Sequence, residues 1–362
     1  MLKTPLDTIE AKVRAGERLT KEDGLTLFAS PDIARIGYLA DLVRQRISGN
    51  NVYFNVNRHV NLTNICVSRC RFCAFGRDEG DKKAYAMNQE EVLRIAKLAA
   101  QDPDLRELHI VSGLHPDWPF EYYLDVLRML KRELPQLHLK AFTAVEIHYF
   151  SKLSGLSVAE VLKALQEAGL QSIPGGGAEI LSDRVRQELC PNKATASEWL
   201  EVQRTAHKMG IRSNASMLYG HIETLEERVD HLLSLRALQD ETGGFQTFIC
   251  FPFHPGNTEL ESTHQRTSLW DELKTMAISR LMLDNFSNIK AYWVMLTLPI
   301  AQLALGFGAN DIDGTVSEEK IMHAAGAKSA TFLTQETIIE TIRQIGRVPV
   351  ERDSMYKIIR TL

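Results

Sequence analysis

The chain has few cysteines and no long run of like charge. Its five cysteines among 362 residues are too few, and odd in number, for a disulfide framework. A net charge of -4 lacks the positive excess with which proteins neutralise nucleic-acid phosphates, so we expect no nucleic-acid partner. The first 24 residues have neither the apolar core nor the cleavage site of a signal peptide, and we expect a cytoplasmic protein.

Long uncharged stretches are also scarce, with one exception. No residue between Ala291 and Asn310 is charged, and this stretch approaches the length of a membrane-spanning helix. Pro299, Gln302 and Gly306 interrupt it. A buried strand, a short connection and a second buried strand account for the same residues, so we expect no membrane association.

Apolar periodicity predicts an α/β fold. Residues 1–50 show apolar spacings of three and four, which predict an N-terminal helical extension. Eight strand-like runs then alternate with amphipathic segments, at 59–65, 107–113, 137–144, 170–177, 211–220, 245–251, 289–296 and 303–309. No dinucleotide fingerprint follows any run, so a parallel (β/α)8 barrel of the TIM type is favoured over an open doubly wound sheet. We expect this barrel to span 51–315, with a C-terminal helical segment, 316–362, packed on it.

Three cysteines lie together in the segment NICVSRCRFCAF, directly after the first expected strand. Cys66, Cys70 and Cys73 have the spacing CxxxCxxC, and no second pair follows at the distance that a structural zinc site needs. Three thiolates can instead hold an iron–sulfur cubane and leave one iron open to another ligand. A chance cluster of buried thiols is the alternative, but Arg69 and Arg71 between the cysteines argue against a buried apolar strand.

This spacing, with Phe72 before the last cysteine, resembles the radical S-adenosylmethionine superfamily. In that superfamily three cysteines hold a 4Fe-4S cluster whose open iron binds S-adenosylmethionine, and one electron cleaves the sulfonium to methionine and a 5'-deoxyadenosyl radical. The resemblance implies that Cys66, Cys70 and Cys73 are the cluster ligands. It also implies an external one-electron reductant such as flavodoxin or ferredoxin, and it leaves a homodimer open.

The resemblance further implies contacts to S-adenosylmethionine. Phe72 is expected to pack near the adenine. Ser112 and Gly113 stand where the superfamily often has a Gly-Gly-Glu stretch that binds the methionine amino group, although this chain lacks the first glycine and the glutamate. Backbone carbonyls at Ser112 and Gly113 remain able to accept hydrogen bonds from the ammonium.

A second set of expected cofactor contacts follows the glycines at 175–177. Glu179 is expected to accept hydrogen bonds from both ribose hydroxyls, because a carboxylate can take two such bonds at once. Its alternative role is a carboxylate at a helix N-terminus. Lys193 or Arg184 is expected to offset the methionine carboxylate, and the alternative for either is a solvated surface charge.

Further motifs narrow the resemblance. The stretches SGLHPDWPFEYY, IPGGGAEIL, CPNK and FICFPFHP resemble the branch that holds the menaquinone enzymes of the futalosine route, the FO synthase halves and a tyrosine lyase. The pairing of KAFTAVEI with DIDGT looks most like the aminofutalosine synthase family. That family adds the adenosyl radical to 3-((1-carboxyvinyl)oxy)benzoate in menaquinone biosynthesis. The products are 6-amino-6-deoxyfutalosine, methionine and carbon dioxide or bicarbonate.

The two carboxylates of that substrate need cationic or multidentate donors. The candidates by position at strand ends are Arg58, Asn61, Arg77, His115 and His254. A lone histidine is more often a structural residue, so each histidine keeps that alternative. The candidates for a general acid or base in the late steps are His59, Glu146 and Asp311.

Three other functions stay open at this point. Cyclic dehypoxanthine futalosine synthase and an FO synthase half share most of these motifs but begin by hydrogen abstraction. A non-catalytic iron–sulfur electron carrier is disfavoured, because the loop lacks a fourth cysteine. Cys190 and Cys250 lie far along the chain and are expected to be structural thiols.

Overall fold

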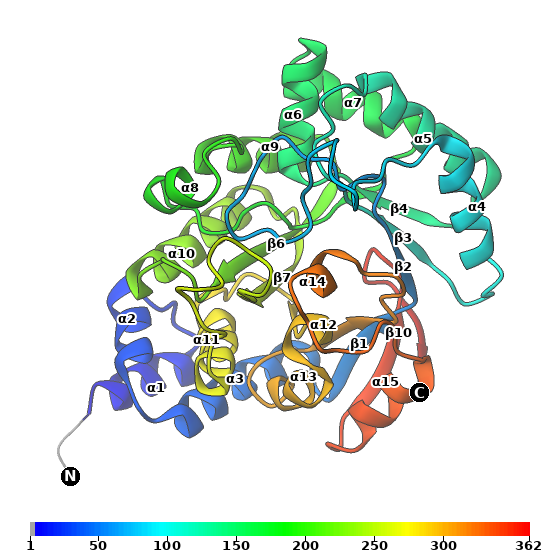
Figure 1. The fold of residues 1–362 in the computed structure, drawn as a ribbon. Helices are drawn as coiled ribbons and strands as arrows, with labels where there is room; N and C mark the ends of the chain where they lie inside the picture. Colours follow the sequence, from blue (N-terminus) through cyan, green and yellow to red (C-terminus); the bar gives the residue numbers. More distant parts are fainter. Residues whose placement is uncertain (1–3) are drawn as a thin grey trace.

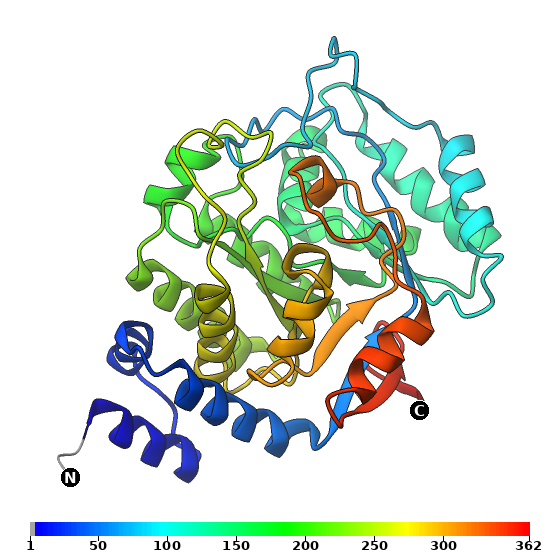
Figure 2. The ribbon, with the colours of Figure 1, turned by 60° about the horizontal axis from the view of Figure 1, so that its bottom comes forward.

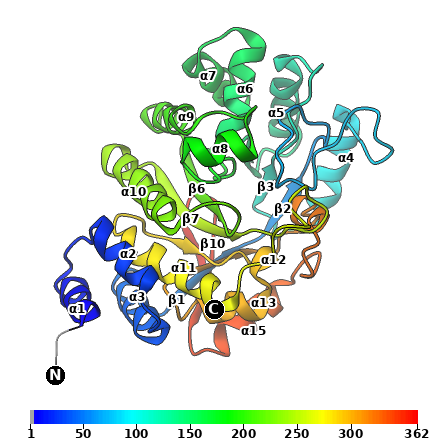
Figure 3. The same ribbon diagram turned by 60° about the vertical axis from the view of Figure 1, so that its left-hand side comes forward.

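Three helices precede the sheet in the computed structural model, which describes residues 4–362. They are α1 (Pro5–Ala15), α2 (Lys21–Ala29) and α3 (Ile33–Ser48). Helix α3 packs along α11 (Leu269–Met282), and α2 contacts α10 (Leu225–Thr242), so this extension covers the outside of one part of the barrel (Figures 1 and 3).

Eight parallel strand positions form the wall of a curled sheet. The first position consists of β1 (Asn51–Asn55) and β2 (Asn57–Val60). The others follow in chain order, each parallel to its neighbour: β3 (Glu107–Ile110), β4 (His138–Ala141), β5 (Ser172–Ile173), β6 (Arg212–Tyr219), β7 (Phe245–Pro252), β8 (Ile289–Lys290) and β9 (Asp311–Gly314). Strand β9 pairs with β1, and the backbone N–H of His59 donates to the carbonyl of Ser317 at 3.0 Å, so the two ends of the row meet. The expected α/β parallel barrel is confirmed.

Helices connect these strands on the outer face of the sheet (Figure 1). Besides α10 and α11 they are α4 (Gln89–Ala99), α5 (Phe120–Glu133), α6 (Ala144–Ser154), α7 (Val158–Ala168), α8 (Asp183–Leu189), α9 (Ala196–Lys208), α12 (Trp293–Leu296) and α13 (Leu298–Ala304). Their starts follow local sequence chemistry. At α4, for example, the Asn88 side chain accepts from the backbone N–H of Glu91 while the Glu91 carboxylate accepts from the N–H of Asn88.

The last expected strand is in the wrong place. Residues 303–309 form the end of α13 and a turn, and the final barrel strand is β9. The uncharged stretch from Ala291 to Asn310 therefore follows β8 with α12 and α13, not with a second strand. Much of this stretch is uncharged because it is buried inside the protein. Buried helices and buried strands are both apolar, so the lack of charge does not distinguish them. Among residues 4–362, no helix is both long and apolar enough to cross a membrane.

The C-terminal segment is a mixture of helix and strand. It contains α14 (Ile321–Ala324) and α15 (Gln335–Arg343), and then β10 (Val348–Arg352) and β11 (Ile358–Thr361), where only helix was expected. Strand β10 pairs in parallel with β1 and antiparallel with β11, so the tail extends the sheet outside the barrel (Figure 2). The C-terminal residues are thus bonded to the first strand of the fold.

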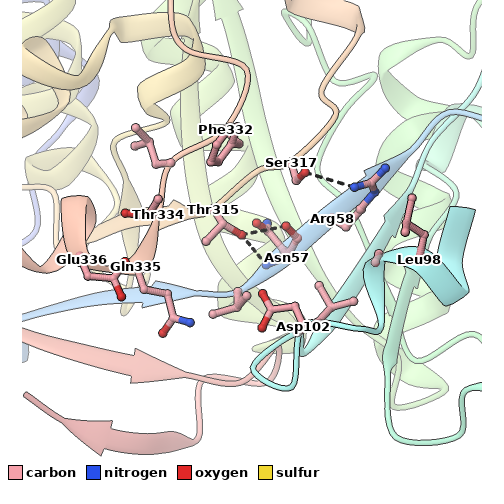
Figure 4. A pocket seen from close by; sticks show the side chains of 14 residues that line it. Asn57, Arg58, Leu98, Asp102, Thr315, Ser317, Phe332, Thr334, Gln335 and Glu336 are labelled. Atoms are coloured by element: carbon pink, nitrogen blue, oxygen red, sulfur yellow. Dashed lines mark hydrogen bonds between the residues drawn. The ribbon is translucent and has the colours of Figure 1, made fainter.

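A strained segment links β9 to α14. Asp313, Val316 and Glu318 have φ values of 73°, 46° and 66°, in the left-handed region that β-branched valine strongly disfavours. Asn57 on β2 holds this segment, because its side-chain oxygen accepts from the N–H of Val316 at 2.8 Å. The backbone carbonyl of Asn57 accepts from the Thr315 hydroxyl at 3.0 Å (Figure 4). The segment directs residues 319–325 toward the carboxyl ends of the barrel strands, where α14 lies in Figure 1.

Candidate active site

A cavity of about 300 Å³ lies inside the barrel near the carboxyl ends of the strands. It receives side chains from the cysteine loop, from the strands and from the segment around α14. The residues expected from the sequence that line it are His59, Cys66, Cys70, Phe72, Cys73, Ser112, Gly113, Glu146, Glu179, Lys193 and His254. One space therefore collects candidates for the cluster, the cofactor and the chemistry.

The cysteine loop is held by backbone hydrogen bonds. The N–H of Cys66 donates to the carbonyl of Arg77 at 3.1 Å, and the N–H of Cys73 donates to the carbonyl of Cys70 at 3.0 Å. Arg69 takes a left-handed conformation, with φ of 50°, at the turn between the cysteines. The three thiols are half-buried and face the cavity.

The three thiols line the same cavity. Across residues 4–362, no group of three or more His, Cys, Asp or Glu side chains is placed to hold a metal ion. Three thiolates on one loop can hold a 4Fe-4S cluster and leave one iron open to another ligand, whereas a structural zinc site normally has four protein ligands. Cys66, Cys70 and Cys73 are therefore the residues that would hold such a cluster.

Gly113 lets the end of β3 pack against this loop. A Cβ atom at Gly113 would lie 2.3 Å from the carbonyl oxygen of Ile65 and 3.1 Å from the Cβ of Cys66. The neighbouring Ser112 accepts a hydrogen bond from the N–H of Leu62 at 3.0 Å. Ser112 and Gly113 thus support the start of the cysteine loop, in addition to lining the cavity.

Glu146 joins Ser112 to helix α6. Its carboxylate accepts from the N–H of Ser112 at 3.0 Å and from the N–H and hydroxyl of Thr143 at 2.7 and 2.8 Å. Burial raises the pKa of Glu146 to about 7, against the opposing effect of these hydrogen bonds. Glu146 forms the capping box of α6 with Thr143, which is a local interaction. Its hydrogen bond from Ser112 joins residues 34 positions apart and depends on the tertiary fold.

Glu179, Lys193 and Phe72 form a compact group beside the cysteine loop. The Lys193 ammonium donates to the Glu179 carboxylate and lies 5.1 Å from the centre of the Phe72 ring. Burial alone would raise the pKa of Glu179, but the Lys193 charge holds that pKa below its ordinary value. Helix α8 begins at Asp183, so Glu179 lies before its first turn and is not a helix N-terminal carboxylate.

Ionisable residues that sequence reasoning missed form the floor of the cavity. His109 stacks on His59, and Lys140 and Lys290 also line the floor. The Lys290 ammonium donates to the Asp313 carboxylate at 2.7 Å. Lys140 and Lys290 could have been found from the sequence, because each is a lysine inside an apolar strand. A charged side chain in the wall of a barrel must face either solvent or a polar interior.

Arg58 lies in a different pocket. Adjacent residues of a strand point to opposite faces, so His59 faces the barrel interior and Arg58 faces outward. The Arg58 guanidinium donates to the Ser317 hydroxyl at 3.3 Å and borders a second cavity of about 400 Å³ near Asp102 and Phe332 (Figure 4).

Four other expected site residues do not line the cavity, and each has a partner within the protein. Asn61 donates to the carbonyl of Val111 at 2.9 Å, and His115 stacks on Trp118. The two arginines bind elsewhere: Arg77 donates to the carbonyl of Gly76, and Arg184 pairs with Glu227 on the surface. None of these side chains lines the cavity at the barrel mouth.

Asp311 is also outside the cavity. It is fully buried on β9, and its carboxylate accepts from the Arg352 guanidinium and from the Tyr356 hydroxyl, each at 2.8 Å. This ion pair ties the C-terminal strands to the barrel. Asp311 is therefore an anchor of the fold, and Asp313, two residues later, lines the cavity in its place.

The two remaining cysteines differ in position. Cys250 is fully buried on β7 near Met276, and burial raises its pKa to about 12. Cys190 is also buried but lies beside Cys70, next to a 2.9 Å hydrogen bond from the N–H of Arg71 to the carbonyl of Leu189.

A parallel barrel whose first loop presents three cysteines to an interior cavity has the arrangement that an iron–sulfur enzyme needs. Comparison with known proteins agrees. Residues 60–235 match the radical SAM superfamily, and residues 242–361 match the CofH/MqnC C-terminal region.

The chain is 48% identical to the aminodeoxyfutalosine synthase of Thermus thermophilus, over 97% of this chain and 95% of that protein. It is 47% identical to the Streptomyces coelicolor protein of the same name, over 97% and 93%. It is also 42% identical, over 94% of both chains, to the 5-amino-6-(D-ribitylamino)uracil--L-tyrosine 4-hydroxyphenyl transferase of Methanothermobacter thermautotrophicus. The chain belongs to the radical SAM superfamily, in the family that these proteins share, and it is a radical SAM enzyme.

Solved structures support the fold. Methylornithine synthase (PylB) superposes with a TM-score of 0.74 at 18% identity, over 94% of this chain and 97% of that one. The FeFe-hydrogenase maturase HydG superposes with a TM-score of 0.76 at 18% identity, over 96% and 77%. Membership of the superfamily implies a 4Fe-4S cluster and S-adenosylmethionine, and the three cysteines of the loop fit that cluster.

Proposed function

We propose that this enzyme joins the 5'-deoxyadenosyl group of S-adenosylmethionine to 3-((1-carboxyvinyl)oxy)benzoate and releases methionine. The product is 6-amino-6-deoxyfutalosine, and the carboxyl group of the vinyl ether leaves as carbon dioxide or bicarbonate. The observation that carries this proposal is one cavity that combines the three-cysteine loop, the Glu179–Lys193 pair and a floor of basic side chains. The 48% identity to an aminodeoxyfutalosine synthase supports it.

The loop and its neighbours would hold the cofactor and the first substrate. Cys66, Cys70 and Cys73 would hold the 4Fe-4S cluster, which when bound supplies the electron that breaks the carbon–sulfur bond of S-adenosylmethionine. An external one-electron carrier of the flavodoxin or ferredoxin type would supply that electron. Glu179 accepts from the ribose hydroxyls, and Phe72 packs on the adenine.

The chain's own residues then direct carbon–carbon bond formation. The 5' carbon would bond to the vinyl CH2, and the aryl group would move from oxygen to carbon. The carboxyl group would then leave as carbon dioxide, and the electron that started the reaction would be returned to the cluster, so that the overall reaction is redox neutral. The side chains of Ile249, Phe251 and Phe253 line the cavity and exclude water and competing hydrogen donors. Their task is to hold the vinyl carbon close to the 5' carbon.

Acid–base work falls to residues that reach the cavity. Burial lowers the pKa of His59, so its imidazole is neutral and can donate or accept a hydrogen bond without carrying a charge. Glu146, with a pKa of about 7, can give or take a proton near neutral pH. Asp311 is excluded from this role because Arg352 and Tyr356 occupy its carboxylate.

An isotope experiment tests the proposal. The anaerobically reconstituted enzyme is given the enol ether and S-adenosylmethionine that carries two deuterium atoms at the 5' carbon. Both labels should remain in the adduct, because addition breaks no bond between that carbon and hydrogen. Methionine and adduct should form in equal amounts, with little 5'-deoxyadenosine.

Hydrogen abstraction gives the opposite pattern. If 5'-deoxyadenosine is the dominant nucleoside with the enol ether, the addition proposal is wrong. The same enzyme should then be given dehypoxanthine futalosine, or L-tyrosine with 5-amino-6-(D-ribitylamino)uracil, the compounds that the archaeal relatives' name contains. A cyclised or hydroxyphenyl-bearing product would identify the abstraction enzyme.

A further inference from the structure

Three basic side chains lie in one row across neighbouring strands at the floor of the cavity. His59 on β2 pairs in register with His109 on β3, which pairs in register with Lys140 on β4. Side chains at paired positions point to the same face of a sheet, and all three line the cavity. The row therefore presents imidazole and ammonium N–H groups to whatever occupies the floor.

The row has unused hydrogen-bond donors. His59 is only 7% exposed, and within the part of the chain that the structure describes its Nε2 atom has no hydrogen-bond partner. The Lys140 ammonium has three N–H groups, and the described residues provide one hydrogen bond, to Glu107 at 2.7 Å. Buried donors without partners cost free energy, and a bound anion would satisfy them.

The position of Glu107 leaves the row cationic toward the cavity. Glu107 precedes His109 by two residues on β3, so it lies deeper in the barrel, and it is not a lining residue. The other floor pair differs, because Lys290 and its partner Asp313 both line the cavity and present no net charge to it. Lys140 is therefore the better anchor for an anion.

We propose that Lys140 and His59 bind the ring carboxylate of the second substrate, an aromatic dicarboxylate. This inference rests on the proposed function. The vinyl carbon must reach the 5' carbon beside the cysteine loop, at the mouth of the barrel. The benzoate carboxylate is at the other end of the molecule and lies at the floor. Its two oxygens accept from the ammonium and from the imidazole Nε2–H.

Equilibrium binding tests the subsite without turnover. The probes are 3-(1-carboxyethoxy)benzoate, a saturated dicarboxylate, and 2-phenoxypropanoate, which lacks the ring carboxylate. Dissociation constants are measured on the reconstituted enzyme with S-adenosylmethionine bound. The wild-type enzyme should bind the dicarboxylate about 10- to 100-fold more tightly, as expected for hydrogen bonds to a charged group.

The informative variant removes the buried ion pair as a unit. In the double variant Lys140→Met, Glu107→Gln no buried carboxylate is left without its cation, and the preference for the dicarboxylate should fall to about threefold or less. Lys97→Met is the matched control, since Lys97 forms an exposed pair with Glu133 on the outer helices, and it should keep the wild-type preference. His59→Asn leaves the Lys140–Glu107 pair intact and should lower the preference partially, which tests the subsite even if the double variant does not fold.

The outcomes separate this inference from the proposed function. If the folded double variant and His59→Asn both keep the full preference, the subsite is wrong, whether or not the wild-type enzyme makes the adduct. If the preference depends on Lys140 but no adduct forms from the enol ether, the subsite stands and the proposed reaction is wrong. If both are correct, the variant should raise KM for the enol ether much more than it lowers kcat.

Discussion

The imidazole ring of His59 stacks on that of His109, with 4.4 Å between the ring centroids and 9° between the ring planes. Burial, and then the neighbouring His109, lower the pKa of His59 to about 3. His59 is therefore neutral near pH 7. It takes part in the site as a hydrogen-bonding group and not as a cationic acid.

The first prediction concerns acid stability. The unfolded chain binds a proton at His59 below pH 6.5 while the folded protein does not, so stability is fully present above pH 6.5 and is lost as the pH falls toward about 3. Each bound proton changes the free energy of unfolding by about 1.4 kcal/mol per pH unit. The free energy of unfolding is measured with denaturant at several pH values between 5 and 8. Its dependence on pH should be weaker for His59→Asn than for the wild-type protein. Equal slopes would mean that His59 titrates normally in the folded state.

The second prediction concerns the cluster ligands. Cys66→Ser, Cys70→Ser and Cys73→Ser should each remove the broad visible absorption and most of the bound iron and sulfide after anaerobic reconstitution, because each substitution leaves one cluster iron without its thiolate. The controls are Cys190→Ser and Cys250→Ser, which should retain the cluster. Cys190 is the stringent control, because it lies beside Cys70. Cluster loss in Cys190→Ser equal to that in Cys66→Ser would show that the ligand set is misassigned.

The third prediction concerns Glu179 and S-adenosylmethionine. Glu179→Gln keeps the shape but removes the charge, and it should weaken S-adenosylmethionine binding by about 1.5 to 3 kcal/mol, the range for hydrogen bonds to a charged group. Glu179→Gln leaves the Lys193 cation buried without its partner. The double variant Glu179→Gln, Lys193→Met removes both charges, so comparing the two shows how much of the effect comes from the unpaired cation. Binding is measured by equilibrium dialysis on the cluster-loaded enzyme. An unchanged dissociation constant with lower thermal stability would make Glu179 a purely structural residue.

The fourth prediction concerns the packing of β3 against the cysteine loop. A methyl group at Gly113 would collide with the backbone carbonyl of Ile65, so Gly113→Ala should displace the start of the loop and lower the yield of cluster-loaded protein. Gly80→Ala is the matched control, because no heavy atom lies within 4 Å of a Cβ built there. Iron content per chain is the measurement. Full cluster loading in Gly113→Ala would show that the loop adjusts to the added methyl group.

The cluster loop and most of the barrel were predictable from the sequence. Three thiols at close spacing are a local feature, and the chemistry of thiolates and iron restricts what they can bind. Strands such as β3 and β6 also carry a local signal, because apolar runs bounded by turn residues predict buried parallel strands. Phe72 of the loop lines the same cavity as Glu179 and Lys193, and the contacts of these three residues to S-adenosylmethionine stay predictions.

Other parts of the fold depended on tertiary context. The apolar run at 303–309 resembles a strand, but so short an apolar run carries no periodicity that separates strand from helix. Strand β10 is stabilised by pairing with β1, nearly 300 residues earlier in the chain, and β11 is stabilised by pairing with β10, so no local pattern marks them.

The sequence by itself determined which chemistry the protein carries, because the spacing of Cys66, Cys70 and Cys73 is a local property of the chain. The tertiary structure decided which basic residues reach the cavity at the barrel mouth. Arg58 and His59 are neighbours in sequence, yet the alternation of a strand sends one outward and the other into the cavity. Lys140 reaches the same floor from another strand, because the in-register pairing of β2, β3 and β4 brings together side chains that sequence distance keeps apart.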